Sequence, residues 1–390
     1  MTWSIWLLSG LLIVPLVNLS FREFSDYAWV VILIAIFTYL LLLGLMTRRV
    51  LFKILFFNIS AIFFALFLFE GFLLIKERSQ TSGKSVQKSG DYIAGAYFSP
   101  HPYLGYAPAN DGVFTSKKTI NNELIYDISY TIKDGLRFTP NSNDNSQNCV
   151  LFFGCSFTFG EGLSDTSTLP FFFNRYAKQD YKVLNYSFHG YGPHQMLANI
   201  ENRVAKDLQG LRGKKNAIYS FMTFHIERAA GFASWDQKGP KYEIIDGNLS
   251  NAGTFSKLSE KTLNKFLRSY IYKRLFFERK PSHYDFIRAI EIIKKSNELL
   301  LKDSVTLYVL VWDNVLSNAK SLQNDYSYFI DEMKKNNIKT LFLHDAIGDF
   351  VEKRLMYSIH TDDLHPNALA NEKIAKYLYL QINDDQQTIN

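Results

Sequence analysis

The uneven distribution of charge is the feature that most constrains this fold. Residues 1–76 hold only eight charged side chains, and three apolar stretches lie between them: residues 1–21, 27–46 and 54–75. The first two stretches are uncharged, and the third contains only Glu70. Each stretch is about 20 residues long, the length of a helix that crosses the hydrocarbon core of a bilayer. The sequence therefore predicts three transmembrane α-helices, with the lipid bilayer as their partner.

The flanking residues of these stretches predict how the anchor is retained and oriented. Residues 1–21 lack the positive n-region and the small-residue cleavage site of a signal peptide, so we expect an uncleaved helix. The loop after the second stretch holds Arg48, Arg49 and Lys53, and short basic loops stay in the cytoplasm. The C-terminal domain is therefore expected on the other side of the membrane. Glu70 is interpreted as interfacial or paired with a lysine or another helix, and the alternative is an intramembrane functional group.

The rest of the chain divides into a linker, a leader and a core. Residues 77–92 are polar and rich in Ser, Gly and Lys, which is typical of a flexible linker. Residues 93–148 contain short β-like runs between turn signals and predict a small β-rich leader. Residues 149–390 alternate apolar runs with amphipathic stretches, which indicates an α/β domain whose parallel sheet lies between helices. Residues 226–284 interrupt this alternation and are expected to form an insertion near the site.

The strands and helices of this core can be placed from the alternation. Five apolar runs predict a five-stranded parallel sheet: residues 149–153, 183–186, 217–222, 305–312 and 340–344. Helices are expected between and after them at residues 167–178, 193–208, 285–302, 321–335 and 367–382. Functional loops gather at the carboxyl ends of parallel strands, so the site is expected there. The formal charge of +6 is spread along the chain and predicts no nucleic-acid partner.

A serine and a histidine occur after the first strand and before the last helix. Ser156 lies in a glycine-rich turn, where small neighbours let a substrate carbonyl approach its Oγ and its backbone N–H. Asp362 and His365 are three residues apart in the segment that enters the last helix. In that spacing the carboxylate can orient the imidazole, whose other nitrogen can face the serine. A serine, a histidine and an orienting aspartate are the groups that acyl transfer requires.

Other interpretations of these residues stay open. Ser156 alone could cap the following helix. A metal site is a second alternative, and its ligands would be Asp362, Asp363, His360 and His365. His360 is also an alternative base, although no carboxylate lies three residues before it. Cys155 is expected to be a small buried thiol that points away from Ser156. The acyl-transfer interpretation needs neither a metal nor an organic cofactor.

Three segments together resemble the SGNH, or GDSL-type, hydrolases. Gly154–Gly160 resembles the first block of that family, with Cys155 in place of the usual aspartate. Asp362–Pro366 is similar to the last block, Asp-x-x-His-Pro. Asn185–Gly190 resembles the second block, in which a glycine N–H contributes to the oxyanion hole. The resemblance covers about residues 93–382 and implies a flavodoxin-like fold in a membrane-anchored bacterial member.

The resemblance implies a role for each site residue. Ser156 would be the nucleophile, His365 the general base and Asp362 the group that orients it. The backbone N–H groups of Ser156 and Gly190 would form the oxyanion hole. The third block normally carries an asparagine, but this sequence has His225 at that position. An imidazole N–H can donate to an oxyanion, so His225 is a candidate third donor.

The resemblance also implies a class of substrate. His189, His194 and Arg228 are expected to shape the substrate pocket, or only to pack. The implied function is a serine esterase of the bacterial inner membrane that removes O-acyl groups from an envelope glycan or lipid, with its catalytic domain periplasmic or extracellular. An O-acyltransferase could use the same triad to modify a surface polysaccharide or glycolipid with an acyl group from a membrane donor protein. A non-catalytic binding or assembly protein is the third alternative.

Overall fold

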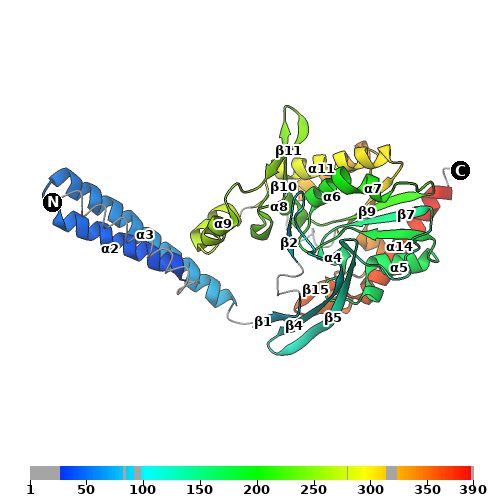
Figure 1. Cartoon of the computed structure of the whole chain (residues 1–390), viewed down its shortest axis with the longest axis horizontal. Helices are drawn as coiled ribbons and strands as arrows, with labels where there is room; N and C mark the ends of the chain where they lie inside the picture. Colours follow the sequence, from blue (N-terminus) through cyan, green and yellow to red (C-terminus); the bar gives the residue numbers. More distant parts are fainter. Residues whose placement is uncertain (1–26, 82–84, 92–97, 279, 313–322, 388–390) are drawn as a thin grey trace. The chain divides into compact units, whose positions relative to one another are not determined.

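The computed structural model describes residues 27–81, 85–91, 98–278, 280–312 and 323–387 (Figure 1). The chain divides into two compact units, which are described one at a time. The first unit contains the N-terminal helices together with residues 256–279 and is called the anchor unit, after the membrane anchor that the sequence predicts. The second contains residues 85–255 and the chain from residue 280 onwards and is called the catalytic unit, because it holds the candidate active site described below. The transmembrane helix predicted over residues 1–21 lies outside the described residues.

Two apolar helices make up the N-terminal part of the anchor unit. They are α2 (Ala28–Met46) and α3 (Val50–Thr81), and they match the helices predicted over residues 27–46 and 54–75. Both are long and apolar enough to span a membrane, a criterion that signal sequences and buried core helices also meet. Only 6% of the apolar window of α3 is buried. A core helix would be mostly buried, so α3 does not have the surroundings of a core helix.

The insertion predicted over residues 226–284 is divided between the two units. Its residues 256–279 belong to the anchor unit and form α9 (Glu260–Phe266) and α10 (Tyr270–Phe276). The remainder stays in the catalytic unit, where β10 (Pro240–Ile245) and β11 (Asn248–Thr254) form a hairpin. The sequence did not reveal that this segment is divided between two units.

Glu70 joins α3 to α10 within the anchor unit. Its side chain is buried, and its two carboxylate oxygens accept hydrogen bonds from the start of α10. The donors are Ser269 Oγ at 3.1 Å, the Tyr270 N–H at 2.7 Å and the Ile271 N–H at 2.8 Å. Glu70 is thus paired with another helix, which is one of the structural alternatives that the sequence left open.

A mixed sheet of nine strands forms the centre of the catalytic unit. Five of its strands are mutually parallel and lie in the order β8-β7-β9-β12-β13, the order of flavodoxin-like folds. These are the five predicted strands: β7 (Asn148–Phe153), β8 (Tyr181–Asn185), β9 (Lys215–Phe221), β12 (Thr306–Val311) and β13 (Lys339–Phe342). The prediction of a five-stranded sheet is nevertheless wrong, because the leader extends it by four antiparallel strands: β1 (Val86–Ser89), β4 (Gly112–Ile120), β5 (Glu123–Lys133) and β6 (Leu136–Arg137).

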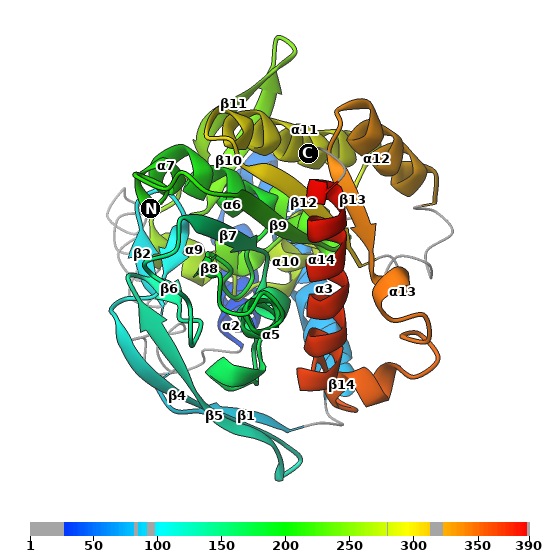
Figure 2. The same cartoon turned by 90° about the vertical axis from the view of Figure 1, so that its right-hand side faces the viewer.

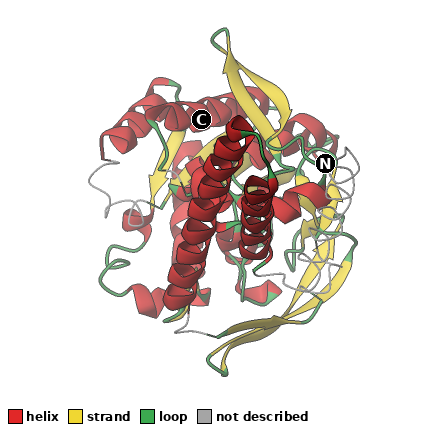
Figure 3. Cartoon of the chain, turned by 90° about the vertical axis from the view of Figure 1, so that its left-hand side faces the viewer, coloured by secondary structure: helices red, strands yellow, loops and turns green. Residues whose placement is uncertain are grey.

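The leader is part of the main sheet, and so is part of the predicted linker. The linker predicted over residues 77–92 is wrong, because α3 continues to Thr81 and Val86–Ser89 pairs with β4. At the other end of the leader, β6 joins β8 through the single pair Arg137 and Asn185. Figure 3 shows the leader as a curved ribbon of strands at the edge of the domain. A separate small hairpin consists of β2 (Ser99–His101) and β3 (Gly105–Ala107).

Helices cover both faces of the parallel strands (Figures 1 and 2). One face carries α6 (Pro193–Asn199), α7 (Ala205–Asp207), α8 (Phe224–Ala229), α11 (His283–Lys302) and α12 (Gln323–Lys335). A π-helical turn (Ile200–Val204) joins α6 to α7. The other carries α5 (Leu169–Tyr176), α13 (Leu343–Ala346) and α14 (Ala368–Gln387). Alternate residues of β7 pack on opposite faces, with Leu151 in one core and Val150 in the other. The strand is therefore buried on both faces, as expected for a parallel sheet between helices.

Candidate active site

Ser156 lies at the point where β7 ends and the short helix α4 (Ser156–Phe159) begins. Gly154 makes this sharp turn possible, because a Cβ there would lie only 2.4 Å from Thr158 Oγ1. Cys155 points into the core between the sheet and α14 and is fully buried. The turn therefore separates two neighbouring side chains: the thiol enters the core, and the Ser156 hydroxyl lies at the carboxyl end of the strand.

The Ser156 hydroxyl belongs to a continuous series of hydrogen bonds. His365 Nε2 lies 2.8 Å from Ser156 Oγ. His365 Nδ1 lies 2.5 Å from Oδ1 of Asp363. This is the arrangement in which a carboxylate holds an imidazole in one tautomer while its other nitrogen faces a nucleophile. Ser156 and His365 thus lie together as the sequence predicts, but the carboxylate belongs to a different residue.

The prediction that Asp362 orients His365 is wrong, because the chain forms a hairpin here. The strands β14 (Ser358–His360) and β15 (Asp363–Pro366) pair antiparallel. Along a strand, residues two apart project from the same face, so Asp363 and His365 point the same way. Asp362 lies in the turn with an exposed side chain, and its N–H donates to His360 Nδ1 at 3.1 Å. His360 in turn pairs with Glu123 at 3.2 Å rather than serving as the base.

Asp363 is held in its ionised form by its surroundings. Its Oδ2 lies 2.8 Å from Nζ of Lys118, and both side chains are largely buried. Burial by itself would raise the pKa of Asp363. The hydrogen bond from His365 and the charges of His365 and Lys118 outweigh this effect and lower the pKa to about 2. Asp363 is therefore a carboxylate at any pH at which an imidazole base can work.

A second carboxylate, Glu161, lies beside the same histidine. Its Oε2 is 2.8 Å from His189 Nδ1 and 3.6 Å from His365 Nε2, and its Oε1 is 3.3 Å from Lys88 Nζ. Burial would raise the pKa of Glu161, but these neighbours lower it well below the ordinary value. Burial lowers the pKa of His189 despite the adjacent carboxylate. The lowered pKa values of both groups are consistent with a neutral His189 that donates its Nδ1–H to an ionised Glu161.

The two lysines that contact these carboxylates are neighbours across the leader strands. Lys88 of β1 pairs directly with Lys118 of β4. Two ammonium groups opposite each other on one face repel, and such pairs destabilise a sheet. Here each ammonium meets its own buried carboxylate, Glu161 for Lys88 and Asp363 for Lys118. The sequence does not predict these roles, because the composition of the two strands is typical of a linker and of a separate leader.

The loop after β8 carries Gly190, the predicted oxyanion-hole residue. Its φ of 73° lies in the left-handed region, and a Cβ there would come within 2.6 Å of both Tyr106 Oη and Trp235 Nε1. Tyr106 also donates a hydrogen bond to the backbone oxygen of His189 at 2.7 Å. Only glycine fits at position 190. The hydrogen bond from Tyr106, which lies in the β2–β3 hairpin, holds the backbone of the loop in place.

His225 lies at the start of α8, directly after β9. Its side chain is fully buried, and Nδ1 lies 2.9 Å from the hydroxyl oxygen of Tyr219. Nε2 has no hydrogen-bond partner among the residues that the structure describes. Burial lowers the pKa of His225 well below its ordinary value, and the charge of nearby Arg228 adds to this. His225 is therefore a neutral imidazole at the same sheet edge as the serine.

The three residues predicted to shape the substrate pocket, His189, His194 and Arg228, differ in how close they lie to the reactive serine and histidine. His189 belongs to the site through Glu161, as described above. His194 Nε2 instead lies 2.7 Å from Oδ2 of the buried Asp236, so it supports the turn that carries Trp235. Arg228 donates to the backbone oxygen of Tyr191 at 2.7 Å and lies close to the Trp235 ring. The sequence analysis missed Trp235, which is 61% exposed beside the Gly190 loop.

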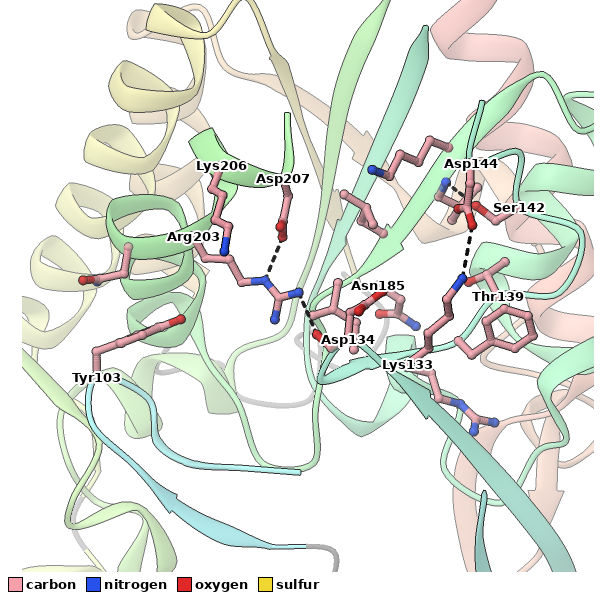
Figure 4. Close-up of a pocket in the computed structure, with 17 residues that line it drawn as sticks. Tyr103, Lys133, Asp134, Thr139, Ser142, Asp144, Asn185, Arg203, Lys206 and Asp207 are labelled. Carbon is pink, nitrogen blue, oxygen red and sulfur yellow. Dashed lines mark hydrogen bonds and ion pairs between the residues drawn. The ribbon is translucent and has the colours of Figure 1, made fainter. Parts of the chain in front are cut away.

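A separate cavity of about 780 Å³ lies where the leader joins the core (Figure 4). Its lining comes from β5, β6, β8 and α7, and its described lining residues include no member of the Ser156 site. Four of the charged side chains that line it form two ion pairs with each other. Arg203 Nε lies 2.7 Å from Asp207, and Lys133 Nζ lies 3.1 Å from Asp144. The size of this cavity therefore does not make it the reactive site.

Comparison with known proteins gives structural neighbours only. The sequence matches no protein-family model and no curated protein. Among solved structures, the chain is similar to TesA with 12% identity and a TM-score of 0.36, over 59% of this chain and 96% of TesA. It is similar to the psychrotrophic esterase EstA from Pseudoalteromonas sp. with 12% identity and a TM-score of 0.35, over 62% of this chain and 99% of that one. A protein from Parabacteroides merdae described as a GDSL-like lipase gives 11% identity and a TM-score of 0.35, over 62% and 98% of the two chains. Because the identities and TM-scores are this low, the functional assignment rests on the geometry of the site itself.

Proposed function

We propose that this protein is a membrane-anchored serine esterase of the SGNH type. The observation that carries the proposal is the series from Ser156 Oγ through His365 to Asp363, with separations of 2.8 Å and 2.5 Å. Such a series supplies a nucleophile, a general base and an orienting carboxylate in one line. The neighbouring structures add esterases and GDSL-type lipases as proteins of similar architecture.

The reaction follows from these positions. His365 Nε2 takes the proton of Ser156 Oγ while Oγ bonds to the acyl carbonyl carbon. Asp363 holds Nδ1–H and stabilises the imidazolium that forms. The imidazolium then gives its proton to the departing alkoxide, which leaves an acyl-serine. A water molecule deprotonated by His365 attacks this ester in the same way and releases the acid, so neither a metal nor an organic cofactor takes part.

The negative oxygen of the tetrahedral intermediate needs donors. The backbone N–H groups of Ser156 and Gly190 are two, and we assign His225 as a third. When Tyr219 donates its hydroxyl proton to His225 Nδ1, the hydrogen of the imidazole is on Nε2. That N–H has no other partner in the described part of the chain and is buried, so it is available to an oxyanion in a low-dielectric site.

Glu161 and the lysines set the charge around the base. The Glu161 carboxylate lies 3.6 Å from His365 Nε2, where its negative charge can stabilise the imidazolium that forms during attack. Lys88 offsets the same charge, so the carboxylate favours the imidazolium without leaving the site strongly negative. We assign Glu161 to stabilisation of the imidazolium during attack, and Lys118 to keeping Asp363 ionised.

The surface beside the oxyanion loop supports an acylated glycan as substrate. Trp235 presents an exposed ring next to Gly190, and Arg228 lies 5.9 Å from the centre of that ring. A flat, exposed aromatic ring offers an apolar platform to one face of a sugar, and a guanidinium can donate to its hydroxyl groups. The substrate that fits is an O-acylated envelope glycan or glycolipid.

We place the anchor in a bacterial inner membrane, with the catalytic unit periplasmic or extracellular. Large apolar side chains of α2 and α3 are exposed, including Leu45 at 60% and Leu51 at 77%. Such side chains are stable in lipid and costly in water. Basic residues concentrate in the loop between the two helices, so this loop is the cytoplasmic end.

An O-acyltransferase is the second candidate, favoured by the burial of the nucleophile. Ser156 is only 8% exposed, and the ring of Phe157 lies 4.9 Å from that of His365. A covered acyl-serine reacts slowly with water and lasts long enough for a sugar hydroxyl to take the acyl group. A membrane acyl-donor protein would then be a partner.

The test uses the full chain in detergent or nanodiscs. A fluorophosphonate probe should label the wild-type protein on Ser156, and Ser156→Ala should lose both the label and hydrolysis of a generic acyl ester. Asp362→Ala is the matched control and should keep both. Labelling that persists in Ser156→Ala contradicts the proposal. A product ratio that shifts to acylated sugar when a glycan acceptor is added selects the transferase over the esterase.

A further inference from the structure

The basic segment of the anchor unit has a composition unlike that of the rest of the chain. Residues 256–279 hold seven Lys or Arg residues against two Glu, a net charge of +5, whereas the whole chain of 390 residues carries +6. The net charge is therefore concentrated in this segment and is not spread along the chain as expected above. The same segment contains five aromatic residues between positions 266 and 277. Basic and aromatic residues together are typical of segments that lie at the surface of an anionic membrane.

Two contacts fix this segment to the apolar helices. Glu70 accepts the three hydrogen bonds from the start of α10 that are described above. Trp29 of α2 donates its ring N–H to the backbone oxygen of Lys265 at 2.7 Å, and its ring stacks on Phe266 at 5.6 Å. The two helices α9 and α10, with the residues that flank them from 256 to 279, are called the basic hairpin below.

The position of these contacts along α3 determines the depth of the basic hairpin. Glu70 follows Val50, the first residue of α3, by 20 residues. At a rise of about 1.5 Å per residue this distance is roughly 30 Å. The hydrocarbon core of a bilayer is also about 30 Å thick. If the basic loop before Val50 lies at one membrane surface, Glu70 and the hairpin bound to it lie at the other.

The exposed side chains of the hairpin suit that depth. Leu275 is 60% exposed and Phe276 is 49% exposed, next to the exposed side chain of Arg274. Apolar side chains beside basic ones allow the former to enter the acyl region while the latter contact phosphates. The rings of Tyr272 and Phe276 are 4.6 Å apart, which makes the apolar part of this surface continuous.

We propose that the basic hairpin binds the headgroups of anionic phospholipids at the membrane surface on the side of the catalytic unit. The chain leaves the catalytic unit at residue 255 and returns to it at residue 280, so this unit is joined to the membrane surface by the hairpin as well as by α3. The inference rests on the proposed membrane anchor and is independent of the esterase chemistry. A catalytic unit joined to the surface twice suits a substrate that is itself membrane-bound.

The test places an environment-sensitive dye on the hairpin of the full chain. Phe276→Cys gives a unique exposed thiol in the described chain, because Cys149 and Cys155 are fully buried. The labelled protein is reconstituted in nanodiscs of phosphatidylcholine with about one-third phosphatidylglycerol. We expect headgroup-labelled, quenching phosphatidylglycerol to reduce the emission about twice as strongly as the corresponding phosphatidylcholine. Raising NaCl from about 0.05 M to about 0.5 M should remove this preference.

A charge-matched pair of variants completes the test. In the hairpin variant, four basic residues are replaced by glutamine: Lys265, Arg268, Lys273 and Arg274. In the control, four exposed lysines of the catalytic unit are replaced by glutamine: Lys117, Lys302, Lys335 and Lys353. The hairpin variant should lose the twofold preference, and the control should keep it.

The outcomes separate this inference from the proposed enzyme. Equal quenching by both lipids in the wild-type protein, or an unchanged preference in the hairpin variant, overturns the inference. Both variants should still hydrolyse a water-soluble ester. Loss of lipid preference with normal hydrolysis supports the hairpin as the lipid-binding element. If Ser156→Ala keeps hydrolysis while the preference is intact, the enzyme proposal fails and the hairpin inference stands.

Discussion

The parallel core and the antiparallel leader contribute different things to the same site. Strands β7 and β9 are buried and nearly free of charge, and their carboxyl ends position Ser156 and His225 respectively. The leader strands are partly exposed, and they bring Lys88 and Lys118 to the buried carboxylates. The comparison indicates that the core determines where the reacting atoms lie, whereas the leader determines their charge.

The strongest test of this comparison concerns the two adjacent aspartates. Asp363→Asn should lower kcat for ester hydrolysis by about 10³–10⁴-fold, because an amide no longer fixes the imidazole tautomer or stabilises the imidazolium. Asp362→Asn should change kcat less than about threefold, because Asp362 lies in the exposed turn. Steady-state kinetics of both purified variants give the answer. The reverse order would restore Asp362 to the site and remove Asp363 from it.

These two residues also show what the sequence can and cannot reveal. The apolar runs of the core were recognisable because each strand is buried on both faces and its residues are almost all apolar. The spacing of Asp362 and His365 matches a family pattern, but in the hairpin from Ser358 to Pro366 the residue on the same face as His365 is the one two positions before it, Asp363. Glu161 could have been recognised from the sequence, because it is an acidic residue between two glycines, Gly160 and Gly162, a few residues after Ser156. Its contact with His189 depends on the pairing of segments that are distant in sequence.

The leader was harder to predict for a physical reason. Lys88 and Lys118 are polar residues in strands with exposed faces, so their segments resemble linkers and surface strands. Only the register of β1 on β4 reveals that the two lysines are opposite each other. Register depends on long-range pairing and not on local composition. For a similar reason, no local pattern in the sequence predicts that Glu70 pairs with α10, which begins 200 residues later in the chain.

The second prediction concerns the core contribution of His225. His225→Phe keeps a buried ring but removes the N–H that we assign to the oxyanion, so kcat should fall about 10²-fold with little change in KM. His194→Phe is the matched control, since its ring supports the turn that carries Trp235. It should raise KM for a glycan ester more than it lowers kcat. A normal kcat in His225→Phe leaves the oxyanion to the backbone donors alone.

The third prediction uses the lowered pKa of Asp363. Its pKa of about 2 lies below the ordinary value of 3.8, so Asp363 stabilises the fold at any pH above 3.8. That contribution, roughly 2 kcal/mol, is lost as the pH falls through about 2. Denaturant unfolding of the detergent-solubilised chain between pH 5 and pH 2 measures it. The free-energy difference between wild type and Asp363→Asn should shrink by that amount over this range. A constant difference means that Asp363 has no favourable charge partner.

The last prediction isolates the leader. Lys118→Met keeps the aliphatic stem but removes the charge that lies 2.8 Å from Asp363. The carboxylate keeps its hydrogen bond from His365, so the loss should be partial, about tenfold in kcat. Lys117 is adjacent on the same strand, points to the other face and pairs with the exposed Asp127. Lys117→Met should therefore leave kcat unchanged. A structural role alone would lower the stability of Lys118→Met equally at every pH. A loss of charge at the carboxylate should instead raise the pKa of Asp363 from about 2, so the contribution of Asp363 to the free energy of unfolding should be lost at a higher pH than in the wild type. If both methionine variants behave like the wild type, the leader is only a support for the sheet, and the charge of the site comes from the core and its loops.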